Sequence, residues 1–185
     1  LTSSHAAILL IAASFEEFVR ETVRAYAAQL LARTSSFSEL PASMTAAVWE
    51  RSLFLLKGSK YGGQSFDRIT AIALSKNIAE FCLNEDKSLD ISTYLAFNER
   101  NLTIKEFNEI MRRVGLGDYA GTVGRNQRFI DHFGTANADK AHAEFVVALN
   151  GFYETRNEVA HAIGSLKASG PTNIERFIEF FEVLE

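Results

Sequence analysis

Residues 136–162 read ANADKAHAEFVVALNGFYETRNEVAHA and contain an apolar stripe without interruption. The residues of this stripe recur at steps of three and four: Ala138, Ala141, Phe145, Ala148, Phe152, Thr155 and Val159. Side chains at that spacing share one face of an α-helix. The sequence therefore predicts one long helix over 136–162 that packs against other helices through this face.

The last turns of this predicted helix carry three polar side chains, Arg156, Asn157 and His161. Arginine can bind two phosphate oxygens at once, and histidine can transfer a proton near neutral pH. These residue types together suit cleavage of a phosphodiester without a metal ion. Asn150 and Glu154 lie on the same polar stripe as Asn157 and His161, so we treat them as candidate substrate-binding residues.

The spacing of the candidate catalytic residues has a geometric consequence. Arg156 and His161 are five residues apart, so an ideal helix rotates by about 140° between them. Asn157 and His161 are four residues apart and share a face. One helix does not easily direct both Arg156 and His161 at one phosphate, whereas two copies related by a two-fold axis can. We therefore expect a homodimer with this helix at the axis.

The rest of the chain predicts an all-α fold, an up-and-down bundle of four to five main helices with additional short ones. Besides the helix over 136–162, helical patterns cover 3–33, 40–57, 66–84, 103–114 and Pro171 to the chain end. Shorter helices are expected near 91–97 and 124–134. We expect the stretch between the helices over 103–114 and 124–134 to be the loosest in the chain, because it contains four glycines: Gly115, Gly117, Gly121 and Gly124. We find no convincing strand pattern and no repeat.

Length and composition restrict the classes of protein. A chain of 185 residues suits a single domain over residues 1–185. A net charge of −4 argues against a broad, non-specific nucleic-acid binder, although it leaves room for a local basic site. No apolar run reaches transmembrane length, so no membrane association is expected. Because the sequence begins at Leu1 and ends within a helical pattern, we expect a piece of a longer protein.

Cysteine and histidine usage argues against a metal site. Cys82 is the one cysteine, so an internal disulfide is impossible and a cytoplasmic, reducing location fits. We expect this cysteine in the core. The four histidines show no zinc-ligand spacing, and Gly62-Gly63 lacks the strand–turn–helix context of a phosphate loop. We therefore expect neither a metal nor a cofactor.

An arginine followed by a histidine at this spacing is a weak pattern, because 12 arginines and 4 histidines give roughly one match by chance. Arg125 and His132 form a second match. We prefer Arg156 and His161 because a long helix supports a site rigidly and because their polar stripe has no simple packing role. A structural interpretation is also open for each residue. Arg156 would form an ion pair with Glu154, and His161 would place a favourable positive charge at the end of a helix.

The segment Arg156-Asn157-x-x-Ala160-His161 resembles the signature of HEPN domains, an all-α superfamily of ribonucleases and related binding modules. The segments Ala13–Phe18 and 98–117 resemble the RiboL-PSP branch. The resemblance implies a dimeric, metal-independent endoribonuclease with Arg156 and His161 catalytic and Asn157 modifying the site. Some relatives carry a tyrosine two residues after the histidine and are neutralised by its modification; Ile163 replaces it here.

Two classes of function follow. The first is an endoribonuclease of the toxin or defence type, whose partners are RNA, a second copy of the chain and an antitoxin or other defence-system protein. The alternative is a catalytically silent dimerisation or RNA-binding module of a larger defence or toxin–antitoxin protein. A helical adaptor without a role on nucleic acid is a third, weaker interpretation.

Overall fold

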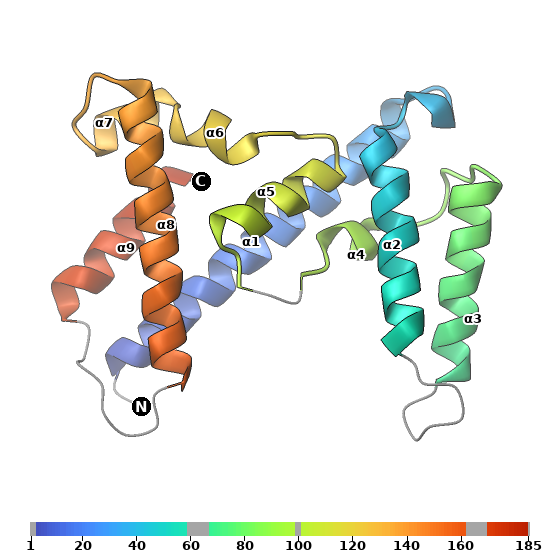
Figure 1. Ribbon diagram of the computed structural model, residues 1–185, viewed down its shortest axis with the longest axis horizontal. Helices are drawn as coiled ribbons and strands as arrows, with labels where there is room; N and C mark the ends of the chain where they lie inside the picture. Colours follow the sequence, from blue (N-terminus) through green and yellow to red (C-terminus); the bar gives the residue numbers. More distant parts are fainter. Residues whose placement is uncertain (1–2, 59–66, 99–100, 162–169, 185) are drawn as a thin grey trace. The chain divides into compact units, whose positions relative to one another are not determined.

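The computed structural model describes residues 3–58, 67–98, 101–161 and 170–184, and these ranges contain helices and no strand (Figure 1). The α-helices are α1 (Ser3–Arg33), α2 (Ala42–Gly58), α3 (Arg68–Asn77), α4 (Ser92–Ala96), α5 (Ile104–Arg113), α6 (Tyr119–Gly124), α7 (Gln127–His132), α8 (Ala138–His161) and α9 (Pro171–Leu184). A 3₁₀ turn at Phe37–Glu39 and a π-helical segment at Ile78–Leu83 complete the elements. The all-α prediction is confirmed.

The chain forms two compact units, which are described separately. The first unit comprises residues 1–19, 98–109 and 118–185, and the second comprises residues 20–97 and 110–117. Helices α1 and α5 each contribute residues to both units. The prediction of one domain over residues 1–185 stays a prediction.

An aromatic cluster fills the core of the first unit. The ring of Phe15 in α1 lies 6.1 Å from that of Phe107 in α5 and 4.6 Å from that of Phe181 in α9. Phe152 of α8 lies 4.8 Å from Phe181 and 5.0 Å from Phe177. Burying one such side chain contributes roughly 1.5–3 kcal/mol, so this cluster joins four helices and anchors the middle of α8.

Helix α8 confirms the long predicted helix but starts two residues later. The Asn137 side chain accepts hydrogen bonds from the backbone N–H groups of Asp139 and Lys140, at 2.9 and 3.0 Å. An asparagine that satisfies these orphan donors is a favourable N-cap. The predicted stop at Ala162 lies outside the described residues.

The buried face of α8 is rotated from the predicted stripe. Leu149 and Tyr153 are fully buried, whereas Ala148 and Thr155, which belong to the predicted stripe, are half-buried. Aromatic and leucine side chains bury more apolar area than alanine or threonine, so they determine which face packs inward. Consequently one strip of α8 beside Ala148 and Thr155 is left open.

The second part of the stretch predicted to be loosest is instead helical, from Tyr119 to Gly124. Asp118 caps α6 by accepting from the backbone N–H of Gly121 at 3.0 Å, and Asn126 caps α7 through the N–H of Arg128 at 3.0 Å. A Cβ atom on Gly124 would lie 2.7 Å from Nδ1 of His142 in α8. Gly124 therefore permits close packing of α6 on α8. The helix predicted over 124–134 is shorter, Gln127–His132.

The second unit contains α2, α3, the π-helical segment and α4. Asp67 caps α3 by accepting from the N–H of Ile69 at 2.9 Å, so the helix predicted over 66–84 begins at Arg68. Arg113 is fully buried, and its Nη1 atom donates to the carbonyl oxygens of Leu95 and Phe97 at 3.0 and 2.6 Å. Buried guanidinium groups require such partners.

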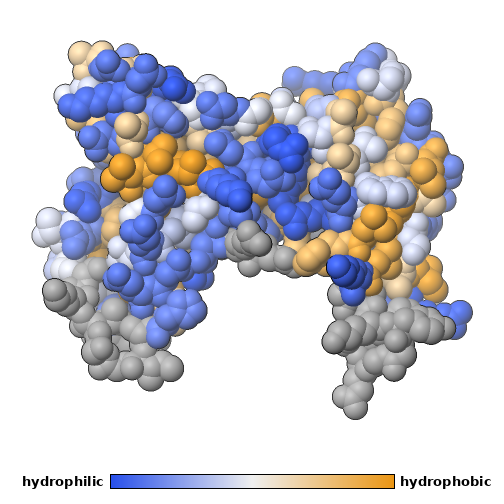
Figure 2. Space-filling view, viewed as in Figure 1, coloured by the Kyte–Doolittle hydropathy of each residue, from blue (hydrophilic) through white to orange (hydrophobic). Residues whose placement is uncertain are grey.

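Several large apolar side chains of α2 and α3 in the second unit are exposed: Trp49, Leu53, Phe54, Ile69 and Ile72. Figure 2 shows apolar surface over these two helices. Cys82, which was expected in the core, is half-buried, and desolvation raises the pKa of its thiol. In the described part of the chain, no helix combines the length and apolar character needed to cross a bilayer.

Candidate active site

The C-terminal half of α8 positions the three candidate catalytic residues. The helix is continuous from Ala138 to His161, so the rotation of about 140° between Arg156 and His161 applies to the folded protein. Arg156 and Asn157 are half-buried, whereas His161 is exposed at the last described position of the helix. Ile163 and Gly164 lie outside the described residues.

Asn157 connects the site to a second segment. Its Oδ1 atom accepts a hydrogen bond from Nδ2 of Asn101, which lies three residues before α5, and a longer one of 3.4 Å from Nη1 of Arg156. Two donors on one carbonyl oxygen fix the orientation of the Asn157 amide. The structure therefore brings Arg156 and Asn157 together with Asn101, whereas His161 lies one turn beyond Asn157 and about 140° around the helix from Arg156.

Asn101 was not among the predicted site residues. It is separated from Asn157 by 56 residues in the sequence, and no local spacing reveals a contact of that range. The sequence signal at Asn101 was a glycosylation-type triplet with Leu102 and Thr103, which carries no information about Asn157.

The Arg156 guanidinium forms no ion pair with any residue that the structure describes. The proposed pairing with Glu154 is absent, and Glu154 is exposed. The Nε atom of Arg156 is buried and lacks a hydrogen-bond partner within the described ranges. A partly desolvated cation with unused donors attracts an anion strongly, and phosphate oxygens match the planar fork of arginine.

Asn150 has a structural contact that the sequence reading did not anticipate. Its Oδ1 atom accepts from the backbone N–H of Ile104 at 3.4 Å. Ile104 is the first residue of α5, where N–H groups lack partners within their own helix. Asn150 therefore has a packing role, because it connects α8 to the start of α5. The prediction that the polar stripe has no such role is wrong for this residue.

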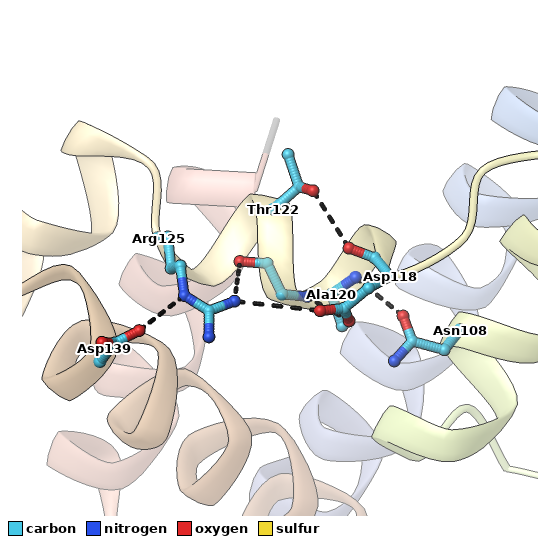
Figure 3. A network of polar contacts seen from close by, with 7 residues as sticks. Asn108, Asp118, Ala120, Thr122, Arg125 and Asp139 are labelled. Carbon is cyan, nitrogen blue, oxygen red and sulfur yellow. Dashed lines mark hydrogen bonds and ion pairs between the residues drawn. The ribbon is translucent and has the colours of Figure 1, made fainter.

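Arg125 and His132, the second arginine–histidine match, have a different environment, and Figure 3 shows the polar contacts of Arg125. Nε of Arg125 donates to Asp139 at 2.8 Å, and Nη1 donates to the carbonyl oxygen of Gly121 at 3.2 Å and lies 3.9 Å from Asp118. These contacts fasten α6 to the start of α8. His132 packs against the rings of three phenylalanines: Phe129, Phe133 and Phe180. Arg125 thus has a structural role that Arg156 lacks.

Acidic, histidine and cysteine side chains do not converge on a metal-binding group anywhere in the described ranges. The candidate site consists of the Arg156 guanidinium, the Asn157 amide in a fixed orientation and the His161 imidazole. It can neutralise a phosphate and transfer a proton.

The comparisons with known proteins identify the family of the chain. A family model described as RiboL-PSP-HEPN matches residues 4–184, which is nearly the whole chain. No curated protein and no solved structure matches the chain. HEPN domains are all-α and are often ribonucleases or nucleotide-binding proteins. The coverage of the match and the helical fold lead to one conclusion: the chain belongs to the RiboL-PSP-HEPN family.

Proposed function

We propose that the chain is a metal-independent endoribonuclease whose active site combines Arg156 and His161 from two copies. The observation that supports this most is the state of Arg156: half-buried, held beside Asn157, and without an ion pair to a described residue. An arginine kept in that state is suited to a ligand that brings negative charge, such as a phosphodiester.

The proposed reaction is an internal transfer within RNA. The 2′-oxygen attacks the adjacent phosphorus while one copy of His161 removes its proton. The bond between phosphorus and the 5′-oxygen breaks, and the protonated His161 of the other copy donates a proton to that leaving oxygen. Arg156 stabilises the negative charge on the non-bridging oxygens. The products are a 2′,3′-cyclic phosphate and a free 5′-hydroxyl group.

A second candidate is a catalytically silent dimerisation or RNA-binding module, and the acidic net charge of −4 favours the dimerisation role of such a module. Incubation of the pure protein with RNA in EDTA, followed by end-group analysis, separates the two. The proposal expects cyclic phosphate ends from wild type and none from His161→Ala. It also expects a rate that falls on both sides of an intermediate pH, since neutral and protonated histidine are required together. Cleavage of a strand lacking the 2′-hydroxyl would exclude the internal attack, and a requirement for magnesium would exclude the metal-free route.

A further inference from the structure

A groove of about 620 Å³ lies between α8 and α9 in the first unit and is closed at one end by α7. Its α8 wall consists of residues at positions i, i+3, i+4, i+7 and i+11: Glu144, Val147, Ala148, Gly151 and Thr155. That strip is about 16 Å long, and Val147 on it is 67% exposed. The volume is within the range of about 300–1,000 Å³ that small-molecule sites occupy. We call this feature the α8–α9 groove.

Gly151 leaves the middle of the α8 wall without a side chain. A Cβ atom on Gly151 would meet no atom within 4 Å, so packing does not require glycine there. Glycine in a helix interior costs about 1 kcal/mol relative to alanine. The bare backbone at Gly151 instead allows a flat ligand to lie directly against α8, with Ala148 beside it and the ring of Phe180 on the opposite wall.

The charged side chains of the groove define the chemistry of that ligand. Glu144 stands on the α8 wall, and Arg176 and Glu179 stand on the α9 wall. All three are exposed, and within the described ranges none forms an ion pair with another residue. Two carboxylates and one guanidinium carry a net negative charge, which disfavours a phosphate in the groove itself.

Guanine offers the complementary set of groups. Its N1–H and exocyclic amino group are adjacent donors for a carboxylate, and its O6 and N7 atoms are adjacent acceptors for an arginine. Adenine lacks the paired donors, and uracil lacks the acceptor pair. The phenylalanine and alanine surface of the groove suits the apolar faces of a base.

We propose that the α8–α9 groove binds an unpaired guanine base of RNA. Thr155 ends the groove, and Arg156 is the next residue of α8, about 100° further around the helix axis. An RNA strand bound by Arg156 would therefore reach the groove by passing around one side of α8. The RNA origin of the base rests on the proposed ribonuclease function. A free guanine nucleotide offers the same chemistry, and the experiment distinguishes the two sources.

The test measures binding without cleavage. Four fluorescein-labelled hexamers with 2′-O-methyl groups throughout would carry one guanine, adenine or cytosine in a uracil background, or uracil at every position. Guanosine 5′-monophosphate would serve as the free nucleotide. Fluorescence anisotropy should show the guanine hexamer bound at least tenfold more tightly than the other three sequences and than the free nucleotide. Glu144→Gln and Glu179→Gln should each reduce the preference severalfold.

Gly151→Leu provides the decisive variant, since leucine is a better helix former and its side chain enters the open groove. It should remove the preference for guanine while the melting temperature is maintained or raised. Ala143→Leu, on an exposed position of α8 outside the groove, and Glu175→Gln, exposed on α9, are the matched controls and should retain the preference.

The outcomes separate this inference from the ribonuclease proposal. Equal affinity for all four hexamers, or an unchanged preference in Gly151→Leu, would overturn the guanine site. Tight binding of guanosine 5′-monophosphate without preference among the hexamers would overturn an RNA-borne base. Preferential binding of the guanine hexamer by a protein that cleaves no RNA would support the groove while removing the proposed enzyme activity.

Discussion

Replacing Arg156 by alanine tests whether this side chain supports the fold or the chemistry. The residue makes one long hydrogen bond, of 3.4 Å to Asn157, and no ion pair with a described residue. A hydrogen bond of ordinary length contributes about 1 kcal/mol net, so this longer one contributes less. The substitution also removes a buried Nε donor that has no partner among the described residues, which offsets part of the loss. We expect the free energy of unfolding to fall by at most about 1 kcal/mol.

The effect on catalysis should be much larger. Removing one donor that stabilises transition-state charge typically slows an enzyme by about 10²–10³-fold, or roughly 3–4 kcal/mol. Thermal unfolding should shift by only about 2–4 °C for a chain of this size, while the initial rate of RNA cleavage in EDTA falls at least 100-fold. Circular dichroism and a fluorogenic RNA substrate would measure the two quantities on the same sample.

Arg125→Ala is the matched control. Arg125 contacts two aspartates and a carbonyl oxygen, and its side chain is 43% exposed, so its loss should cost about 0.5–1 kcal/mol of stability. Cleavage should continue at nearly the wild-type rate. A melting temperature lowered by more than about 10 °C in Arg156→Ala, or cleavage retained by that variant, would refute the assignment of Arg156 to the chemistry.

Three further predictions concern other residues. Asn101→Ala should reduce the cleavage rate less than loss of Arg156 does, because it releases the amide of Asn157 without removing a charge. Single-turnover kinetics would measure this rate, and either a full loss of cleavage or an unchanged rate would contradict the prediction. Gly124→Ala should destabilise the protein by about 1–3 kcal/mol in urea unfolding, because the new methyl group overpacks against His142, and an unchanged midpoint would contradict this packing. Cys82 should react with iodoacetamide at pH 8 more slowly in the folded than in the urea-unfolded protein, because burial raises its pKa and lowers the thiolate fraction; equal rates would contradict that burial.

Local periodicity was sufficient to predict the long helices. α1 matches its predicted limits, and α9 begins at the predicted proline, because each carries apolar residues at regular helical spacing over many turns. Periodicity failed where glycine had two possible meanings. Gly121 and Gly124 looked like flexible positions, but both are buried: Gly121 lies against the capping side chain of Asp118, and Gly124 lies against His142 and Phe145 of α8. Only the partner helix distinguishes a glycine that loosens the chain from one that permits close contact.

Residue type and spacing led to Arg156, Asn157 and His161 as candidate site residues, and their catalytic role stays a prediction. The contacts that reach these residues from other segments were not predicted. The contact of Asn101 with Asn157 and that of Asn150 with Ile104 join segments far apart in the sequence, so neither leaves a local signal. The open strip of α8 that forms the groove became visible only when Leu149 and Tyr153 proved to be the buried residues.

The proposed two-copy active site predicts that activity depends on both copies of the chain at once. Arg156 and His161 point about 140° apart, and the proposed reaction uses one histidine as base and its two-fold mate as acid. A dimer with one His161→Ala copy should then be inactive. When wild type and His161→Ala are unfolded, mixed in equal amounts and refolded together, random pairing leaves about one quarter of the dimers with two intact copies. Cleavage should fall to about one quarter of the all-wild-type rate, whereas independent monomeric sites would retain about one half. A linear decline with the wild-type fraction would rule out the shared site even if His161 proved essential.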